Sequence, residues 1–219
     1  MANSTTSPVP ADPGSLTTDQ RDLAERRQPR PAPGLPPFGG SSDTLRIAVR
    51  HTAWMPTVTD LQRDYRSAIG HFASGVTVVT ATGPSGHAGM TTNAVSSLSL
   101  DPILLLVCFD NSSRTLPIVR DHGRFAVNVL RAGDEDLAQI FASKMIPEEK
   151  FEAATHNVDH GVPVLDDALA WFVCDVHELI EGGDHTIGVG RVTEFHYDDG
   201  DPLMFFRGKY ARLHRHDEH

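Results

Sequence analysis

The sequence has few cysteines, no long apolar run and fewer basic than acidic residues, and each shortage excludes a class of protein. No stretch approaches the roughly 18 consecutive apolar residues that a membrane helix needs. The formal net charge of -10 over 219 residues argues against a nucleic-acid partner, because such partners require a basic surface. Cys108 and Cys174, the two cysteines, stand in apolar runs without metal-ligand spacing, so we expect buried, reduced thiols and no metal site.

The two ends of the chain differ in composition from the middle. Residues 1–45 contain eight of the 15 prolines, interleaved with polar residues, and are expected to form a disordered extension. An arm that docks a partner is the alternative. Residues 214–219 are read as a flexible tail rather than a metal-binding one, although three of them are histidines. The folded domain is therefore expected over residues 46–213. The N-terminus lacks the apolar core of a secretory signal, so we expect a cytoplasmic protein.

The pattern of the middle segment predicts many strands and few helices. A first helix is expected after Asp60, a candidate N-cap, because apolar residues recur there at helical spacing, and a second is expected over residues 134–142. Several runs rich in β-branched and aromatic residues, separated by Gly, Pro and Asp turns, indicate an antiparallel sheet that closes into a barrel. These runs cover residues 76–82, 103–109, 125–130, 168–180, 186–197 and 203–207.

Three segments contain residue types that suit a ligand. Residues 91–99 hold six hydroxyl or amide side chains between apolar neighbours, which suits a planar polar ligand, whereas a loop that satisfies its own backbone is the competing interpretation. Residues 110–115 follow an apolar strand with Ser, Arg and Thr, which suits a phosphate. The Gly-rich turn at residues 182–190 presents Asp184 and His185, although a histidine in such a turn is more often a surface residue. Tyr210 follows the last of the expected strands and suits either packing or stacking on a ring.

Six sequence blocks, taken in order, resemble one known family. The chain resembles the flavin reductase-like family with an FMN-binding split barrel, in particular the reductase components of two-component flavin-dependent monooxygenases. The blocks are FASGVTVVT (72–80), GMTTNA (89–94), SLSLDP (97–102), FAVNVL (125–130), GDHT (183–186) and PLMFFRGKY (202–210).

The resemblance implies a fold and an activity. The fold is mainly β, a six-stranded antiparallel split β-barrel (Greek key) with a few flanking helices, and it forms a homodimer with flavin near the subunit interface. The activity is reduction of FMN or FAD by hydride transfer from NADH or NADPH, with the reduced flavin passed to a separate monooxygenase. No basic cluster for a 2'-phosphate is evident in the sequence, which favours NADH over NADPH.

The resemblance also implies roles for individual residues. His185 is expected to orient the nicotinamide or polarise the reduced flavin, and Asp184 to fix the turn. Where many relatives have Asn-Ser-Phe, this chain has Asn93, Ala94 and Val95, so a hydroxyl and a ring are missing. The residues implied to bind the cofactor are Thr77, Val78, Met90, Thr91, Thr92, Asn93, Ala94, Ser97, Ser99, Asn111, Ser112, Ser113, Arg114, Thr115 and Tyr210.

Two alternatives remain at the level of sequence. A protein of the same barrel fold could store, shield or sense flavin without turnover, because a fold does not fix a function. An oxidase acting on a phosphorylated, vitamin-like amine is the other alternative. It would need a basic pocket, and the sequence shows few clustered Lys or Arg residues.

Overall fold

The computed structural model describes residues 57–214, so the expectations for residues 1–45 and 215–219 lie outside the described residues. The first described element is helix α2 (Val58–Ile69), whose N-cap is Thr57. The prediction of Asp60 as N-cap is wrong, because Asp60 is the third helical residue. The Asp60 carboxylate accepts from the Thr57 backbone N–H, while the Thr57 hydroxyl accepts from the Asp60 N–H, which is a capping box.

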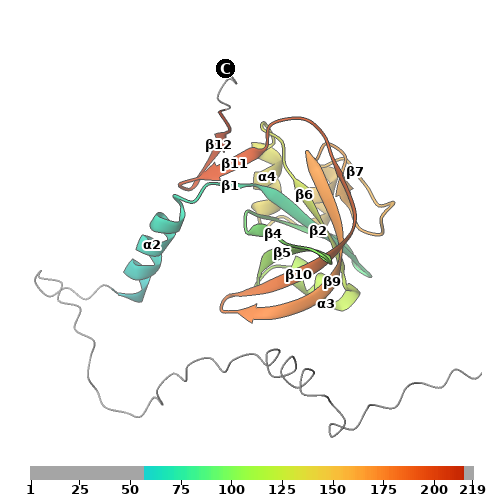
Figure 1. Cartoon of the computed structure of the whole chain (residues 1–219), viewed down its shortest axis with the longest axis horizontal. Coiled ribbons are helices and arrows are strands. Elements are labelled where there is room, and N and C mark those ends of the chain that lie inside the picture. Colours follow the sequence, from blue (N-terminus) through green and yellow to red (C-terminus); the bar gives the residue numbers. More distant parts are fainter. Residues whose placement is uncertain (1–56, 215–219) are drawn as a thin grey trace, which may run out of the picture. The chain divides into compact units, whose positions relative to one another are not determined.

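A seven-stranded antiparallel sheet forms the centre of the molecule (Figure 1). Its strand order is β3-β2-β6-β9-β10-β5-β4, with β3 and β4 at opposite edges. This confirms the predicted mainly β, antiparallel architecture. The main sheet has seven strands, because residues 86–100 add two strands separated by Asn93 and Ala94, while the expected strand at residues 203–207 joins a smaller sheet. The strands are β2 (Thr77–Gly83), β3 (Gly86–Thr92), β4 (Val95–Leu100), β5 (Ile103–Asp110), β6 (Arg124–Val129), β9 (Ala170–Gly182) and β10 (His185–Tyr197).

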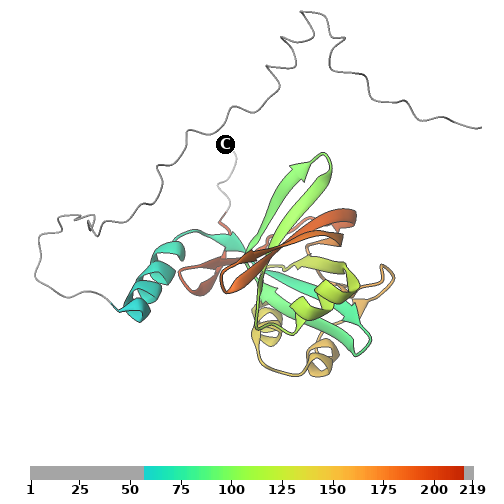
Figure 2. The same cartoon turned by 90° about the horizontal axis from the view of Figure 1, so that it is seen from below.

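Two smaller sheets accompany the main one. The first has the order β1-β11-β12 and contains β1 (Ser74–Gly75), β11 (Leu203–Phe206) and β12 (Lys209–Arg212). The second pairs β7 (His156–Asn157) with β8 (Val164–Leu165). In Figure 2 the long hairpins of the main sheet extend to one side of the body that the helices cover.

Three short helices pack on the strands. Helix α3 (Thr115–His122) contacts β2 and β3, and α4 (Glu135–Ala142) and α5 (Pro147–Glu152) contact β3. Only α4 was predicted, so the expectation of a single further helix is wrong. Helix α3 contains Pro117, which from sequence reads as a helix breaker, and α5 is only six residues long, which leaves too few turns for an apolar periodicity to show. None of the helices within residues 57–214 is long and apolar enough to cross a membrane.

The alternation of buried side chains along the strands builds two main apolar clusters. One includes Val78, Leu130 and Phe141, and the other includes Phe109 and Phe125, whose rings meet edge to face. The cysteines are both free. Cys174 is fully buried as predicted, whereas Cys108 is only half-buried because alternate residues of β5 face away from the core.

Candidate functional site

A cavity of about 500 Å³ lies where β3, the start of α3 and the α4–α5 connection meet. The side chains around it combine hydroxyl groups, three cationic groups, one carboxylate and apolar surface. This mixture is typical of a site for a phosphorylated organic ligand. The principal lining residues are Gly89, Met90, Thr91, Asp110, Ser112, Ser113, Arg114, Thr115, Phe141, Ser143, Lys144 and Lys150.

One end of this cavity is formed by the turn that leads from β5 into α3. The Asp110 carboxylate accepts from both the backbone N–H and the hydroxyl of Ser112, each at 2.7 Å, and these bonds lower the pKa of Asp110. The Ser113 hydroxyl accepts from the Leu116 N–H at 3.2 Å. Because the first N–H groups of a helix lack intrahelical partners, the start of α3 adds donors and a positive dipole end to the hydroxyl groups.

Two cationic side chains reach the same cavity from different helices. The Arg114 guanidinium donates to the backbone carbonyls of Lys144 and Met145, both at 3.2 Å, which fixes it across the cavity edge. The Lys150 ammonium is buried and donates to the Phe141 carbonyl at 2.9 Å. Burial lowers the pKa of Lys150, and the nearby charge of Arg114 lowers it further. An anion at this position would relieve both effects.

A second, smaller cavity of about 200 Å³ shares Thr91 and Ala142 with the first. Thr92 and Asn93 line it from the end of β3, and Tyr210 lines it from β12. Tyr210 packs edge to face on Phe205, and burial raises the pKa of its phenol, with a further contribution from the charge of Glu135. An aromatic ring beside amide and hydroxyl groups suits a planar ring that carries polar edges.

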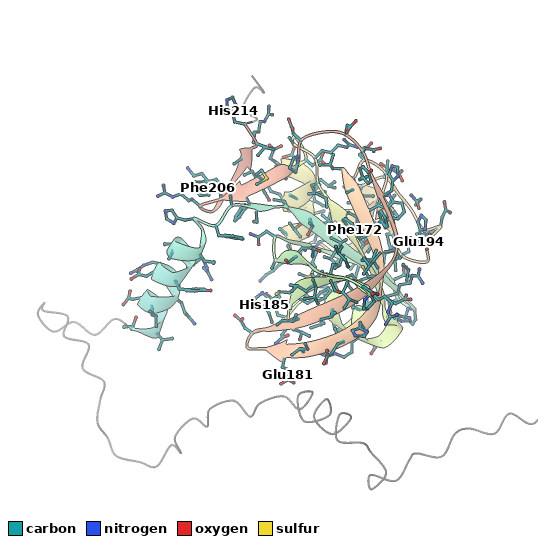
Figure 3. The ribbon with its side chains drawn as sticks, in the orientation of Figure 1. Phe172, Glu181, His185, Glu194, Phe206 and His214 are labelled. Carbon is teal, nitrogen blue, oxygen red and sulfur yellow. The ribbon has the colours of Figure 1, made fainter. Side chains whose placement is uncertain are left out.

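The Gly-Asp-His turn joins β9 to β10 next to the first cavity. Figure 3 shows His185 at the tip of this hairpin. His185 pairs in register with Asp110, the residue at the cavity edge. The His185 Nδ1 atom lies 2.8 Å from the Asp184 carboxylate, and this bond lowers the pKa of Asp184. The Asp184 side chain is 96% exposed and the His185 side chain 43% exposed, so the ring is accessible to a ligand from solution.

Asn111 ties this turn to the segment that lines the cavity. Its backbone N–H donates to the Asp184 carbonyl at 3.1 Å, and its side-chain amide donates to the Gly183 carbonyl at 3.2 Å. Its side-chain oxygen accepts from the Thr186 hydroxyl at 2.7 Å. The side chain lines a separate cavity beside α3, so the structure does not bring Asn111 together with Ser112 to Thr115.

Several other predicted residues also lie apart from the two cavities. Thr77 and Val78 are buried in β2, where the Thr77 hydroxyl donates to the Thr92 carbonyl at 2.7 Å. Ala94 lies between β3 and β4, and its carbonyl accepts from the Cys108 N–H. Ser97 and Ser99 line an apolar groove between β4 and its neighbours. Of the predicted set, the two cavities gather Met90, Thr91, Thr92, Asn93, Ser112, Ser113, Arg114, Thr115 and Tyr210.

Sequence reasoning missed Lys150 and Phe141. Both come from helices α4 and α5, which follow the predicted segments in the chain by many residues. A lysine next to an apolar residue in a short charged helix gives no signal of burial. The donors at one end and the aromatic side chain at the other fit a flavin nucleotide, whose phosphate and ring system need such surroundings.

Comparison with known proteins agrees with this fit. Residues 69–214 match the flavin reductase like domain family. A protein named FMN reductase (NADH) RutF from Agrobacterium fabrum is 36% identical over 171 residues, which cover 76% of this chain and 98% of the relative. A solved structure of the NADH:FAD oxidoreductase SgcE6 from Streptomyces globisporus, in complex with NAD and FAD fragments, has a TM-score of 0.69 and 32% identity. The match covers 76% of this chain and all (100%) of that one.

Two further relatives differ in length or role. A probable flavin reductase from Rhizobium meliloti is 43% identical over 150 residues, which are 68% of this chain and only 48% of that relative, so the chain spans about half its length. The reductase component of a 4-nitrophenol 4-monooxygenase/4-nitrocatechol 2-monooxygenase from Rhodococcus opacus is 38% identical over 151 residues, covering 68% of this chain and 80% of that protein. The family match spans most of the described residues and all six sequence blocks, and the chain belongs to the flavin reductase-like family.

Proposed function

We propose that this protein is an NADH-dependent flavin oxidoreductase that reduces FMN or FAD and supplies the reduced flavin to a partner monooxygenase. The observation that carries the proposal is the pair of neighbouring cavities that share Thr91 and Ala142, with hydroxyl and cationic groups in one and Tyr210 in the other. The names of the relatives, which include NADH-dependent reductases and a monooxygenase reductase component, support the same activity.

The phosphate of the flavin would bind in the larger cavity. Ser113 and Thr115 offer hydroxyl groups at the start of α3, and Arg114 offers a cation, whereas the Ser112 hydroxyl already donates to Asp110. The Lys150 ammonium has three N–H donors and uses one for the Phe141 carbonyl, so it can keep this bond while donating to a phosphate. A phosphate bound between Arg114 and Lys150 would also offset the repulsion between these two positive charges.

The ring system would lie along Thr91, Thr92 and Asn93 toward Tyr210. The hydroxyl of Thr91 is committed to the Ala138 carbonyl at 2.7 Å, and the Asn93 amide donates to the Ser74 hydroxyl at 2.9 Å. These bonds hold the end of β3 in place, so backbone groups and the Asn93 side-chain oxygen remain to contact the ring edge. Tyr210 closes the far side.

The turn with His185 would receive the nicotinamide. Flavin and NADH supply the electron-transfer chemistry between them, so the protein has to bind and orient both. His185 faces solvent beside Asp110, and Asp184 holds its Nδ1 atom. We assign Asn111 a positioning role, because its three hydrogen bonds fix this turn relative to the phosphate-binding residues. Ser97, Ser99, Thr77 and Val78 then support the barrel, and the homodimer and the cytoplasmic location stay predictions.

The deciding experiment measures oxidation of NADH and NADPH, each with FMN and with FAD, by the full-length protein. Turnover with NADH that requires flavin is the expected result. Flavin binding without turnover under any of the four combinations would favour the non-catalytic storage or sensor alternative. Replacement of His185 by Ala provides the site test: unchanged turnover and unchanged KM for NADH would remove His185 from the proposed site.

A further inference from the structure

A cluster of four aromatic rings fixes helix α5 to strand β3. The ring cluster consists of His87 on β3, Phe141 on α4, Phe151 on α5 and His156 on β7. Phe151 lies at its centre, with ring centroids 5.5 Å from His87, 5.3 Å from Phe141 and 5.0 Å from His156. All three contacts are edge to face. Helix α5 is therefore bound to β3 and β7 through one side chain.

Helix α5 has few local interactions that could hold it without this packing. It is six residues long, and no side chain caps its N-terminus. Its buried residues are Lys150 and Phe151. Because short helices depend on packing for their stability, the position of α5 depends on the Phe151 ring. The neighbouring Lys150 lines the cavity proposed for the flavin phosphate, so the ring cluster also places its ammonium group.

The two phenylalanine rings cannot move closer to β3. A Cβ atom at Gly89 would lie 2.6 Å from the Phe141 ring and 3.4 Å from the Phe151 ring, so both rings already pack close to the strand backbone. Packed interiors leave little free volume for such shifts. A repulsion within the ring cluster must therefore displace α5 outward.

Each of the two histidines is held by a hydrogen bond from outside the ring cluster. The Thr82 hydroxyl lies 3.0 Å from His87 Nδ1, and a hydroxyl can donate or accept, so this contact persists when the ring gains a proton. The His156 Nδ1 atom lies 2.9 Å from the Ala154 carbonyl, which only accepts. Nδ1 of His156 therefore carries the hydrogen, and Nε2 is left to gain a second one. The two imidazole centroids are 5.6 Å apart, so two charged rings would repel each other.

His156 is the titratable group that faces His87 within residues 57–214. Strand β2 presents Thr82 to His87, and α5 presents Phe151. Helix α3 packs on the opposite face of the β2–β3 pair, where its His122 lies beside Gly83. The ammonium of Lys150 donates to the Phe141 carbonyl. On the far side of His156, β8 pairs through Leu165, which is apolar.

The packed cluster disfavours a proton on His87. Burial lowers the pKa of His87 from its ordinary value of 6.5, and the charge of His156 lowers it further. When α5 moves away, both causes weaken and His87 binds a proton more readily. The packed arrangement therefore has its full stability above pH 6.5 and loses stability as the pH falls below that value.

We propose that His87 and His156 position Lys150 through Phe151 and release it in acid, so that the protein binds the flavin phosphate less tightly as the pH falls. Neither histidine lines the phosphate cavity, so both are positioning residues. The inference rests on the proposed function, because it requires Lys150 to contact the phosphate of a bound flavin.

The first test is a fluorescence titration of the full-length protein with FMN and with riboflavin across the mildly acidic range. The FMN phosphate has its own second pKa of about 6, which weakens binding equally in every variant, so the comparison is between wild type and variant. One proton taken up on release changes an equilibrium by at most about tenfold per pH unit. Between about pH 7.5 and about pH 5.5, the Kd of wild type for FMN should rise about 3- to 10-fold more than that of His87→Phe or His87→Gln.

The two His87 variants and one control separate titration from packing. His87→Phe keeps a ring against Phe151, and His87→Gln keeps a polar partner for Thr82, whereas neither gains a charge in acid. His196→Gln removes a histidine of β10 whose ring contacts Trp171 and Asp198, and it should behave as wild type. Riboflavin has no phosphate, so its affinity should change equally with pH in wild type and in all three variants.

The second test measures the pKa of His87 by NMR in protein with isotopically labelled histidine rings. Coupling between two sites is reciprocal, so a phosphate that holds Lys150 must also oppose the proton on His87. Saturating FMN should lower the pKa of His87 by about 0.5–1 unit, which is the same 3- to 10-fold effect, and riboflavin should leave it unchanged.

Two results would overturn the inference and leave flavin reduction intact. One is an equal pH dependence of FMN binding in wild type and both His87 variants, and the other is a pKa of His87 that FMN does not change. An excess pH dependence of equal size for FMN and riboflavin would also overturn it, because the effect would then not pass through the phosphate. Absence of FMN binding by wild type at neutral pH would instead overturn the proposed function, and this inference with it.

Discussion

Removing the Asn111 side chain tests how the His185 turn is positioned. Asn111→Ala deletes the amide that donates to Gly183 and the oxygen that accepts from Thr186, while the backbone bond to Asp184 stays. Each side-chain hydrogen bond contributes about 0.5–1.5 kcal/mol, and we take the lower half of that range because Asn111 is exposed, although its partner Thr186 is buried. The turn should therefore lose about 1–2 kcal/mol of its preference for the observed conformation.

Such a loss lowers the fraction of molecules with a correctly placed turn. Because 1.4 kcal/mol corresponds to a factor of ten, kcat/KM for NADH should fall about 5- to 30-fold. The dissociation constant for flavin should stay within about twofold, because the hydroxyl and cationic groups of the larger cavity are untouched. Thr186→Val removes one of the same two bonds and should give a smaller fall in the same parameter.

The assay is steady-state NADH oxidation at saturating flavin, with flavin affinity measured separately by fluorescence quenching. Asn111→Ala is also combined with His185→Ala, and Glu181→Gln, which lines the same cavity as Asn111, serves as control. If Asn111 acts through His185, the second substitution adds little to the first. An equal loss in both backgrounds, or a flavin affinity that falls in parallel with kcat/KM, would refute the reasoning.

Three further outcomes follow from the site and the core. Lys150→Met keeps the length of the side chain and removes its charge. It should weaken FMN binding about 10- to 100-fold and leave riboflavin binding unchanged, because charge-assisted hydrogen bonds contribute about 1.5–3 kcal/mol. Equal effects on both ligands in a fluorescence titration would speak against a phosphate contact. Gly190→Ala should cost about 1–3 kcal/mol of unfolding free energy in urea, since a methyl group there meets the Phe125 ring at 2.6 Å, whereas Gly75→Ala meets nothing within 4 Å and should be nearly neutral. Burial raises the pKa of Cys174 from 9.0 to about 12, so the stability that this thiol contributes is complete below pH 9.0 and is lost as the pH rises toward 12. At pH 8 the Cys174 thiol should resist a thiol reagent until the protein unfolds, and rapid labelling of the native protein would contradict the burial.

The strand pattern could be predicted because it depends on local sequence. Runs of β-branched residues between turn residues place β2, β5, β6, β9 and β10 within two or three residues of their observed bounds. The N-cap of α2 was misplaced because Thr57 and Asp60 both have capping side chains, and only the backbone geometry distinguishes their roles.

The candidate site likewise contains some residues that the sequence could predict and others that it could not. Ser112, Arg114 and Thr115 follow directly after an apolar strand, so one segment of sequence places them together. Lys150 joins them because α5 folds back onto β3, and no local pattern reports that contact. The sequence by itself therefore determined the strands, their turns and the order of the family's blocks. Only the tertiary structure decided that Lys150 faces the same cavity as Arg114, and that Asn111 turns toward His185 instead of the phosphate side, because such contacts depend on long-range packing.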